Sequence, residues 1–419
     1  MTRVISDALG VPARVLTAAR AHRGLVTLCV TVTTSYGVLF YAFPVLSPAI
    51  AADTGWTLTT VTALFSASQV VAGLGSVAVG RWLHRRGPRP VMTAAALVAV
   101  PSLAVLASAG DLWLFGAAWL AAGAAMSGLF YPPAFAALTH WYEQGRVRAL
   151  TALTLVAGLA STVFAPLTAA LEQAWGWRGA YLVLAAVLAL VVVPLHAFAL
   201  PPAWSAPVAH GGSGAPGAAV RAVVRGRAFW ALTASLALGS LTVYAVVVNL
   251  VPLLAARGLD AATAAWALGL GGVGQVLGRL VYAPLERRSA PVPRAVAVLG
   301  ACAATTLLLA LVPGPWAVLM AVAVLAGMAR GVLTLLKATA VADRWGTGGY
   351  AAISGLMHLP LMLAVALAPW IGAALAGVLG GYPAAFAVLG ALAAVGAATA
   401  LASGPRPRPP PIPPGRGRR

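Results

Sequence analysis

The ten residues from Gly80 to Arg89 read GRWLHRRGPR, and they separate two long apolar runs at residues 58–80 and 90–110. Each run is long enough to cross about 30 Å of hydrocarbon as an α-helix. A similar basic stretch, LERR at residues 285–288, lies about 200 residues further along and again separates two apolar runs. The pattern therefore predicts membrane-spanning helices joined by short loops, in two halves that resemble each other.

The composition excludes a soluble protein and explains the high positive charge. The 419 residues are 61% hydrophobic and only 8% charged, with a mean hydropathy of +0.92, whereas a soluble domain carries about 25% charged residues. With a cytoplasmic N-terminus, the 27 basic residues fall on the inner side, apart from Arg178, Arg257 and those within spans. This distribution accounts for the net charge of +19 without a nucleic-acid partner. Because Lys337 is the only lysine, the arginine-rich composition indicates a GC-rich bacterial genome, and hence the bacterial inner membrane.

The apolar runs predict an all-α membrane protein with about twelve transmembrane helices in two six-helix halves. The predicted spans are 24–50, 58–80, 90–110, 112–138, 149–171, 179–201, 229–256, 262–285, 294–312, 315–340, 349–376 and 382–402. These spans divide the chain into a cytoplasmic N-terminal segment (1–23), an N-terminal half (24–201), a flexible basic cytoplasmic linker (202–228), a C-terminal half (229–402) and a disordered Pro/Arg cytoplasmic tail (403–419).

Two further stretches repeat at the same spacing of about 200 residues. FAP at residues 164–166 recurs as LAP at 367–369, and GWRGAY at 176–181 recurs as GYPAAF at 381–386. Two halves in the same orientation, related by an axis along the membrane normal, are typical of secondary transporters.

The basic loop at residues 80–89 resembles the signature loop of the major facilitator superfamily, which reads Gly-x-x-x-Asp-Arg-x-Gly-Arg-Arg/Lys. His84 stands where the family has its Asp. The resemblance implies the major facilitator fold and a gating role for this loop, without the usual charge pair. The matching residues are Gly80, Arg85, Gly87 and Arg89.

Other motifs resemble the monocarboxylate-porter and oxalate–formate-exchanger branch of that superfamily. They are FYAFP at residues 40–44, YP at 131–132 and GWR at 176–178. The animal porters of this branch carry a Lys, an Asp and an Arg at their site, where this chain has Val45, Gln275 and Arg279. The resemblance therefore implies that Arg279 recognises an anionic substrate, and it weakens the proton-coupled lactate mechanism.

Basic side chains inside the spans are the strongest indication of function, because no Asp or Glu accompanies them there. A charge in hydrocarbon costs roughly 2.5 kcal/mol or more, so it marks a functional candidate. Arg279 can hold a carboxylate with two parallel hydrogen bonds, or it can extend along its stem to the membrane surface. Arg330 lies in a small-xxx-small pattern typical of helix contacts, either as a substrate ligand or as a structural charge bound to backbone carbonyls. Lys337 is expected to extend to the membrane surface.

Neutral polar groups complete the predicted substrate site. Tyr41, Asn249, Gln275 and His358 are the candidates, and an interhelical hydrogen bond is the alternative role for Tyr41, Asn249 and His358. In the second span, Thr62, Ser66 and Gln69 share one face and could contribute in the same two ways.

The sequence predicts a secondary active or facilitative transporter that moves a small, monocarboxylate-like organic anion by alternating access. One alternative is a major facilitator efflux pump for a drug or a secreted metabolite. Another is a membrane-embedded enzyme, which the spans do not favour because they contain no nucleophile–base or metal motif. We expect a monomer with both termini cytoplasmic, no cofactor and no enzymatic activity. Anion exchange or uniport is expected rather than proton symport, with His358 as the side chain in a span that can titrate near neutral pH.

Overall fold

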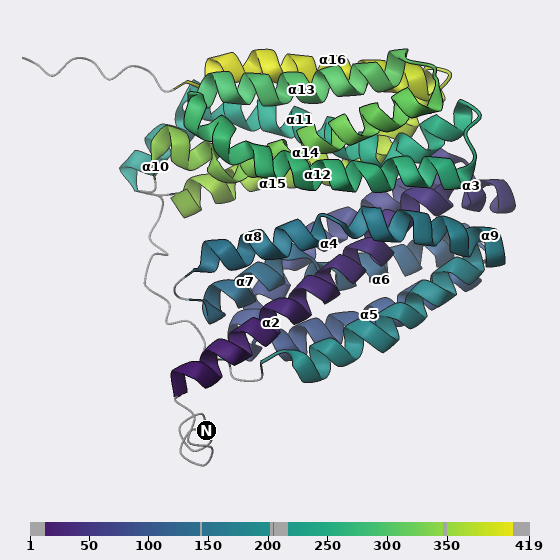
Figure 1. Ribbon diagram of the computed structural model, residues 1–419, viewed down its shortest axis with the longest axis horizontal. Coiled ribbons are helices and arrows are strands. Elements are labelled where there is room, and N and C mark those ends of the chain that lie inside the picture. Colours follow the sequence, from purple (N-terminus) through teal and green to yellow (C-terminus); the bar gives the residue numbers. More distant parts are fainter. Residues whose placement is uncertain (1–12, 143–144, 202–203, 205–216, 347–349, 405–419) are drawn as a thin grey trace, which may run out of the picture.

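The computed structural model describes residues 13–142, 145–201, 204, 217–346 and 350–404, which are built from helices (Figure 1). The N-terminal half contains α2 (Ala13–Tyr36), the π-helical turn η1 (Gly37–Tyr41), α3 (Ala42–Thr54), α4 (Leu58–Arg86), α5 (Pro88–Ser108), α6 (Leu112–Leu129), α7 (Tyr131–Trp141), α8 (Arg146–Ala157), α9 (Ala160–Val187), η2 (Leu188–Val192) and η3 (Leu195–Ala199). After α10 (Ala218–Arg225), the C-terminal half contains α11 (Arg227–Ala256), α12 (Ala261–Arg288), α13 (Pro291–Leu311), α14 (Trp316–Trp345), α15 (Tyr350–Val378), α16 (Tyr382–Ala400) and η4 (Leu401–Ser403). The tail from residue 405 and most of the predicted linker lie outside the described residues.

The number of membrane spans depends on one glycine. Length and apolarity mark 11 candidate spans, but one of them, Arg146–Ala199, contains 54 residues. A single helix of that length would measure about 80 Å, far more than the roughly 30 Å of a bilayer core. Gly176 interrupts it with φ 66° and ψ 174°, a backbone conformation that side chains disfavour. The run therefore forms two spans, and the predicted fold of twelve transmembrane helices is confirmed.

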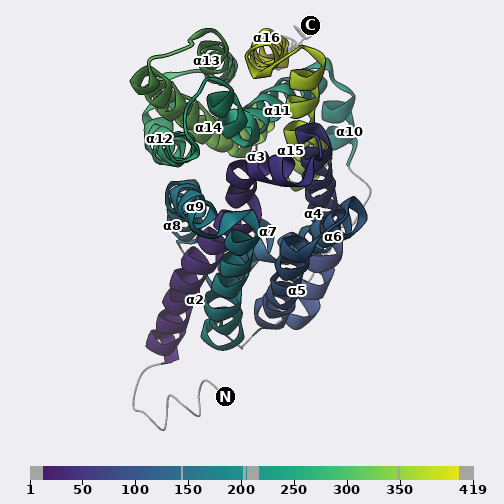
Figure 2. The same ribbon diagram turned by 90° about the vertical axis from the view of Figure 1, so that its right-hand side faces the viewer.

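The spans form two bundles, α2–α9 and α11–α16, which Figures 1 and 2 show as separate halves of the molecule. The halves touch where α4 packs against α15, α9 against α12 and α3 against α11. Hydrogen bonds strengthen these contacts, since buried polar groups in lipid must find partners within the protein. Three of them are Thr59 Oγ1 to the Ala373 carbonyl (3.3 Å), the Trp370 N–H to Ser66 Oγ (3.0 Å) and Thr162 Oγ1 to the Gly269 carbonyl (2.8 Å).

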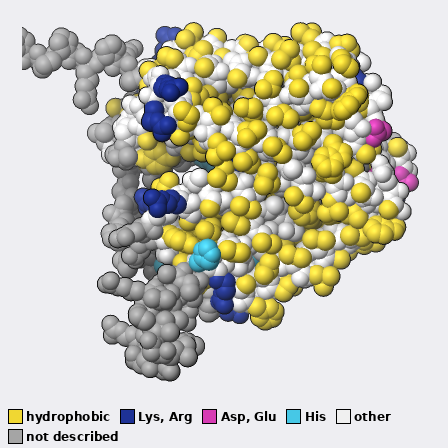
Figure 3. Space-filling view, viewed as in Figure 1, with side chains coloured by type: hydrophobic (Ala, Val, Ile, Leu, Met, Phe, Trp, Pro, Cys, Tyr) yellow, Lys and Arg dark blue, Asp and Glu magenta, His cyan; other side chains and the backbone are white. Residues whose placement is uncertain are grey.

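Charged side chains divide between the two ends of the bundle, and Figure 3 shows basic groups at its left edge and acidic groups at its right. The end of α4, the starts of α5 and α8, the helix α10 and the end of α12 carry the arginines of the basic end, which are Arg81, Arg85, Arg86, Arg89, Arg146, Arg148, Arg221, Arg225, Arg287 and Arg288. The acidic end carries Asp53, Asp111 and Asp260. Asp111 and Asp260 cap α6 and α12 by accepting backbone N–H bonds of 2.9 Å, which suits the positive end of a helix dipole. These two acids at this end therefore have structural roles.

Helices α12 and α14 approach closely through glycines, which confirms the helix contact predicted from the Gly327–Gly331 pattern. A methyl group on Gly327 would overlap the Gly271 carbonyl oxygen, and one on Gly331 would overlap the Gln275 carbonyl oxygen. Because membrane helices associate mainly through close packing, these glycines fix how α14 sits against α12. They also fix the position of Arg330, which lies between Gly327 and Gly331 on α14.

We expect Gly327→Ala to lower the free energy of unfolding by roughly 1–3 kcal/mol, the usual cost of overpacking a well-packed interior. The purified variant should unfold at a lower temperature than the wild type in a thermal-unfolding measurement in detergent. Gly300→Ala in α13 is the matched control, because a methyl group there meets nothing within 4 Å. Equal unfolding temperatures for the two variants would contradict the close contact between α12 and α14.

Candidate functional site

A central cavity of about 180 Å³ lies between the two halves. The N-terminal half lines it with aromatic and thioether groups, and the C-terminal half adds residues of α11 and α15. Its principal lining residues are Tyr36, Phe40, Gln69, Met126, Phe130, Tyr244, His358 and Met362. A second cavity of about 220 Å³ shares Ser76, Ser127 and Pro132 with the first and reaches His84 at the basic end. The second cavity therefore adjoins the central cavity on the side of the basic end, within the N-terminal half.

The π-helical turn η1 directs the aromatic groups of the first span. Gly37 begins this turn and packs directly on the Phe164 ring, where a methyl group would overlap the ring carbons. An extra residue in the turn rotates the following side chains relative to those of α2, and such turns often occur at functional sites. Phe40 consequently lines the cavity. Tyr41, a predicted site residue, is buried beside Phe40, with ring centroids 5.2 Å apart.

Arg279 on α12 connects the two halves. Its guanidinium Nη1 donates a hydrogen bond to the Thr154 carbonyl of α8, and the side chain is only 6% exposed. A break at Gly158 separates α8 from α9. A methyl group on Gly158 would lie 3.0 Å from the Arg279 Nη1. Gly158 therefore leaves the room that Arg279 occupies. The Arg279 side chain is turned into the protein, not toward the membrane surface.

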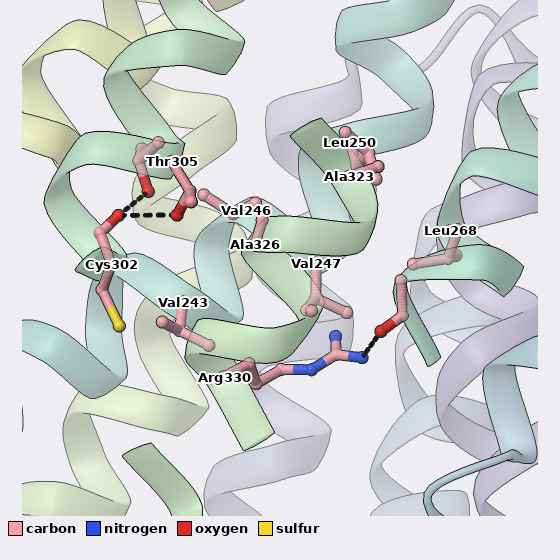
Figure 4. A pocket seen from close by; sticks show the side chains of 13 residues that line it. Val243, Val246, Val247, Leu250, Leu268, Cys302, Thr305, Ala323, Ala326 and Arg330 are labelled. Carbon is pink, nitrogen blue, oxygen red and sulfur yellow. Dashed lines mark hydrogen bonds between the residues drawn. The ribbon is translucent and has the colours of Figure 1, made fainter. Parts of the chain in front are cut away.

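Arg330 on α14 is equally buried, with 5% exposure, and lies in the C-terminal half. It borders a small cavity of about 20 Å³ whose other walls, such as Val243 and Val247, are mostly apolar. Figure 4 shows its guanidinium pointing toward the Gly271 carbonyl of α12, at a distance of 3.5 Å. This geometry fits the interpretation of Arg330 as a structural charge bound to a backbone carbonyl better than its interpretation as a substrate ligand.

Lys337 corrects one expectation, because its side chain does not extend to the membrane surface. Its Nζ lies 5.6 Å from the centroid of the Tyr244 ring, and Tyr244 lines the central cavity. The face of an aromatic ring attracts a cation, so the interior offers this ammonium group a partner. Lys337 follows Arg330 by two helical turns on the same face of α14, a spacing that could have indicated its inward direction.

The neutral candidates separate into two groups. His358 and Gln69 line the cavity. Asn249 instead donates hydrogen bonds to the Ala245 carbonyl (2.9 Å) and, between helices, to the Pro369 carbonyl (3.2 Å). Gln275 is 7% exposed on α12 and does not line the central cavity. Sequence reasoning missed Tyr244 and Phe130 as cavity residues, because an aromatic side chain in an apolar span gives no sign of the face it occupies.

The signature loop lies at the basic end. His84 and Arg85 are exposed, and Arg89 is partly buried in the first turn of α5. Gly87 ends α4 with φ +80° and packs against Trp204, whose indole N–H donates to the His84 carbonyl at 3.1 Å. Gly80 has open space around it. Within the described residues the ion pairs are Arg178–Asp53 and Arg294–Asp343, so the described part of this loop forms none.

No group of three His, Cys, Asp or Glu side chains that could hold a metal ion occurs among the described residues. The polar and polarisable groups that line the central cavity are aromatic rings, thioethers, an amide, an imidazole and serine hydroxyls.

The comparison with known families agrees with this architecture. The sequence pattern of the family described as Major Facilitator Superfamily matches residues 28–357 and 240–419. The chain belongs to the major facilitator superfamily. Within this superfamily it lies near the monocarboxylate transporters, and it is a multi-pass membrane transporter.

Relatives and solved structures resemble this major facilitator protein over most of its length. Monocarboxylate transporter 11 of Homo sapiens is 30% identical over 382 residues, which cover 85% of this chain and 77% of the relative. Monocarboxylate transporter 13 of Bos taurus is 28% identical over 365 residues, covering 86% and 83%. The crystal structure of a bacterial homologue of the human lysosomal transporter Spinster, inward-facing and unoccupied, superposes with a TM-score of 0.69 at 15% identity, covering 92% of this chain and 95% of the other. This last likeness concerns the fold alone.

Proposed function

We propose that this transporter moves a small organic anion across the membrane by alternating access. The observation that carries the proposal is the charge of the spans. Arg279, Arg330 and Lys337 lie within them, whereas none of the 8 acidic residues falls inside a predicted span. Buried cations without nearby carboxylates favour a negatively charged substrate, because such a ligand supplies the missing counter-charge.

Lys337 lies behind the wall of the central cavity, in contact with the lining residue Tyr244. A carboxylate that enters the cavity can pair with its ammonium group. Arg279 can then exchange the Thr154 carbonyl for the substrate, since an ionised acceptor forms the stronger hydrogen bond. This exchange loosens the contact between α8 and α12, and so links anion binding to the movement of the halves.

We place the basic end in the cytoplasm of a bacterial cell, because cytoplasmic loops of membrane proteins carry the excess of Lys and Arg. The contacts between α4 and α15 extend to Thr59 and Ala373 near the acidic end, whereas the cavities extend toward the basic end. These two observations support a state that is closed to the outside and open toward the cytoplasm, as alternating access requires.

Cysteine labelling tests the orientation. In a background where Cys29 and Cys302 are replaced by Ala, we expect a membrane-impermeant maleimide to label Asp111→Cys in intact cells. It should label Arg146→Cys only after the membrane is opened. The reverse pattern would show that the basic end faces outward and would remove the assignment of the cavity to the cytoplasmic side.

An efflux pump for lipophilic compounds is the second candidate, and one observation favours it. Aromatic rings and the thioethers of Met126 and Met362 form much of the cavity wall, and such surfaces adapt to varied apolar ligands. The two candidates differ in the charge of the substrate. A neutral or cationic drug gains little from a cavity with Lys337 behind its wall.

Uptake into proteoliposomes distinguishes these candidates. Purified protein in vesicles should accumulate radiolabelled organic anions in exchange for an internal anion, without an imposed pH gradient. Lipophilic amines and neutral drugs should neither be transported nor compete. Transport of those drugs with no response to any carboxylate would favour the efflux pump instead.

A further inference from the structure

The side chains around the central cavity bear on the class of substrate. On the side of the N-terminal half, the rings of Tyr36 and Phe130 stack with centroids 3.9 Å apart and an interplanar angle of 10°. Phe40 and the Met126 thioether continue this surface. Flat rings and sulfur atoms favour contact with another aromatic ring. This wall is called the aromatic wall below.

Two serine hydroxyl groups beside the aromatic wall already have partners. Ser76 and Ser127 each donate a hydrogen bond of 2.6 Å to a backbone carbonyl of their own helix. Their protons are therefore not free for a ligand, although their oxygen atoms can still accept. A second carboxylate placed on this side would lose its hydration without gaining a donor from either serine.

The positive charge lies behind Tyr244, whose ring contacts that of Phe40 edge to face with centroids 6.2 Å apart. Tyr244 comes from α11 and its ring centroid lies 5.6 Å from the Lys337 ammonium, and His358 of α15 also lines the cavity. Arg279 and Arg330, by contrast, point to the backbone carbonyls of Thr154 and Gly271. One ammonium group therefore lies next to Tyr244, a ring that lines a largely aromatic cavity.

The size of the cavity also matters. Its volume of about 180 Å³ is roughly ten times the 10–15 Å³ that one water requires, so a two- or three-carbon acid would leave part of it to water. A small acid would leave water in contact with the aromatic wall. That apolar surface would then not be removed from water, and its burial would not contribute to binding. A molecule with one ring and one carboxylate fills the space beside the aromatic wall and the space next to Tyr244.

Resting on the anion transport proposed above, we propose that the substrate is an aromatic monocarboxylate. Its ring lies on the aromatic wall formed by Tyr36, Phe40 and Phe130, and its carboxylate points toward Lys337. This arrangement also accounts for the features that favoured the efflux pump, because the apolar wall then binds the ring of an anion.

Isothermal titration calorimetry on the full-length protein in detergent tests the proposal with four probes. They are benzoate, cyclohexanecarboxylate, acetate and terephthalate, which vary the ring, its aromaticity and the number of charges. We expect benzoate to bind at least about tenfold more tightly than acetate or terephthalate, and more tightly than cyclohexanecarboxylate. Equal affinities for acetate and benzoate would overturn the aromatic assignment and leave anion transport standing.

Two variants separate ring recognition from general packing. Phe130→Leu should weaken benzoate binding about tenfold and change cyclohexanecarboxylate binding less. Phe198→Leu is the matched control, because Phe198 is 76% exposed on the outer surface, and it should leave both affinities unchanged. An unchanged benzoate affinity in Phe130→Leu would contradict the aromatic wall. Failure of every carboxylate, both in calorimetry and in vesicle uptake, would overturn this inference and the proposed function together.

Discussion

Replacing Lys337 by Met is expected to reduce organic-anion transport by roughly 10–100-fold, the effect of losing one charge-assisted contact of about 1.5–3 kcal/mol. Met has a similar length and stays apolar, so the contact with Tyr244 is replaced without a large change in volume. Initial rates of uptake in proteoliposomes measure the change.

Two controls define the result for Lys337. Lys337→Arg keeps the positive charge and should retain much of the transport rate. Arg288→Gln removes a positive charge from an exposed position at the basic end and should transport like the wild type. Normal transport by Lys337→Met, with the same amount of folded protein, would show that this ammonium group does not bind the anion.

Arg279→Lys is the second change with a large expected effect. A lysine keeps the charge but loses the planar group that can bond a carboxylate and then return to the Thr154 carbonyl. We expect transport to fall roughly 10–100-fold, while the protein still inserts and elutes as a single species in size-exclusion chromatography.

Gly158→Val examines the same contact from the other half. The added side chain occupies the space within 3.0 Å of the Arg279 Nη1, so it should separate α8 from α12. The conformational equilibrium should then shift away from the structure described above, as measured by spin-label distances between the basic ends of α4 and α14. Gly110→Ala, with open space around it, is the control. Normal transport in both Arg279→Lys and Gly158→Val would assign Arg279 a purely structural role and leave Arg330 as the remaining arginine candidate.

The sequence predicted the membrane spans well, because apolar runs interrupted by charge, Pro or Gly mark helix ends directly. The break at Gly176 and the close packing at Gly327 also follow from local residue types. These features depend on length, charge and size, which a single sequence displays.

The direction of the side chains was harder to predict. In a lipid bilayer, the outer face of a helix and its inner face are both apolar, so hydrophobic periodicity does not show which side of α14 carries Lys337 inward. The π-helical turn at Gly37 lies in a uniformly apolar run, and its effect on Phe40 depends on packing against Phe164. The bond between Arg279 and Thr154 joins residues of different halves, and no local pattern indicates such a pair.

Counterflow tests the central claim, organic-anion transport, most directly. Proteoliposomes loaded with a high concentration of unlabelled carboxylate are diluted into a trace of the same labelled anion at pH 8, with protein-free vesicles subtracted for passive permeation. We predict transient accumulation of label that requires Lys337, needs no pH gradient and is blocked by other carboxylates. Label that never rises above the protein-free level for any carboxylate, together with counterflow of a neutral or cationic drug, would contradict organic-anion transport.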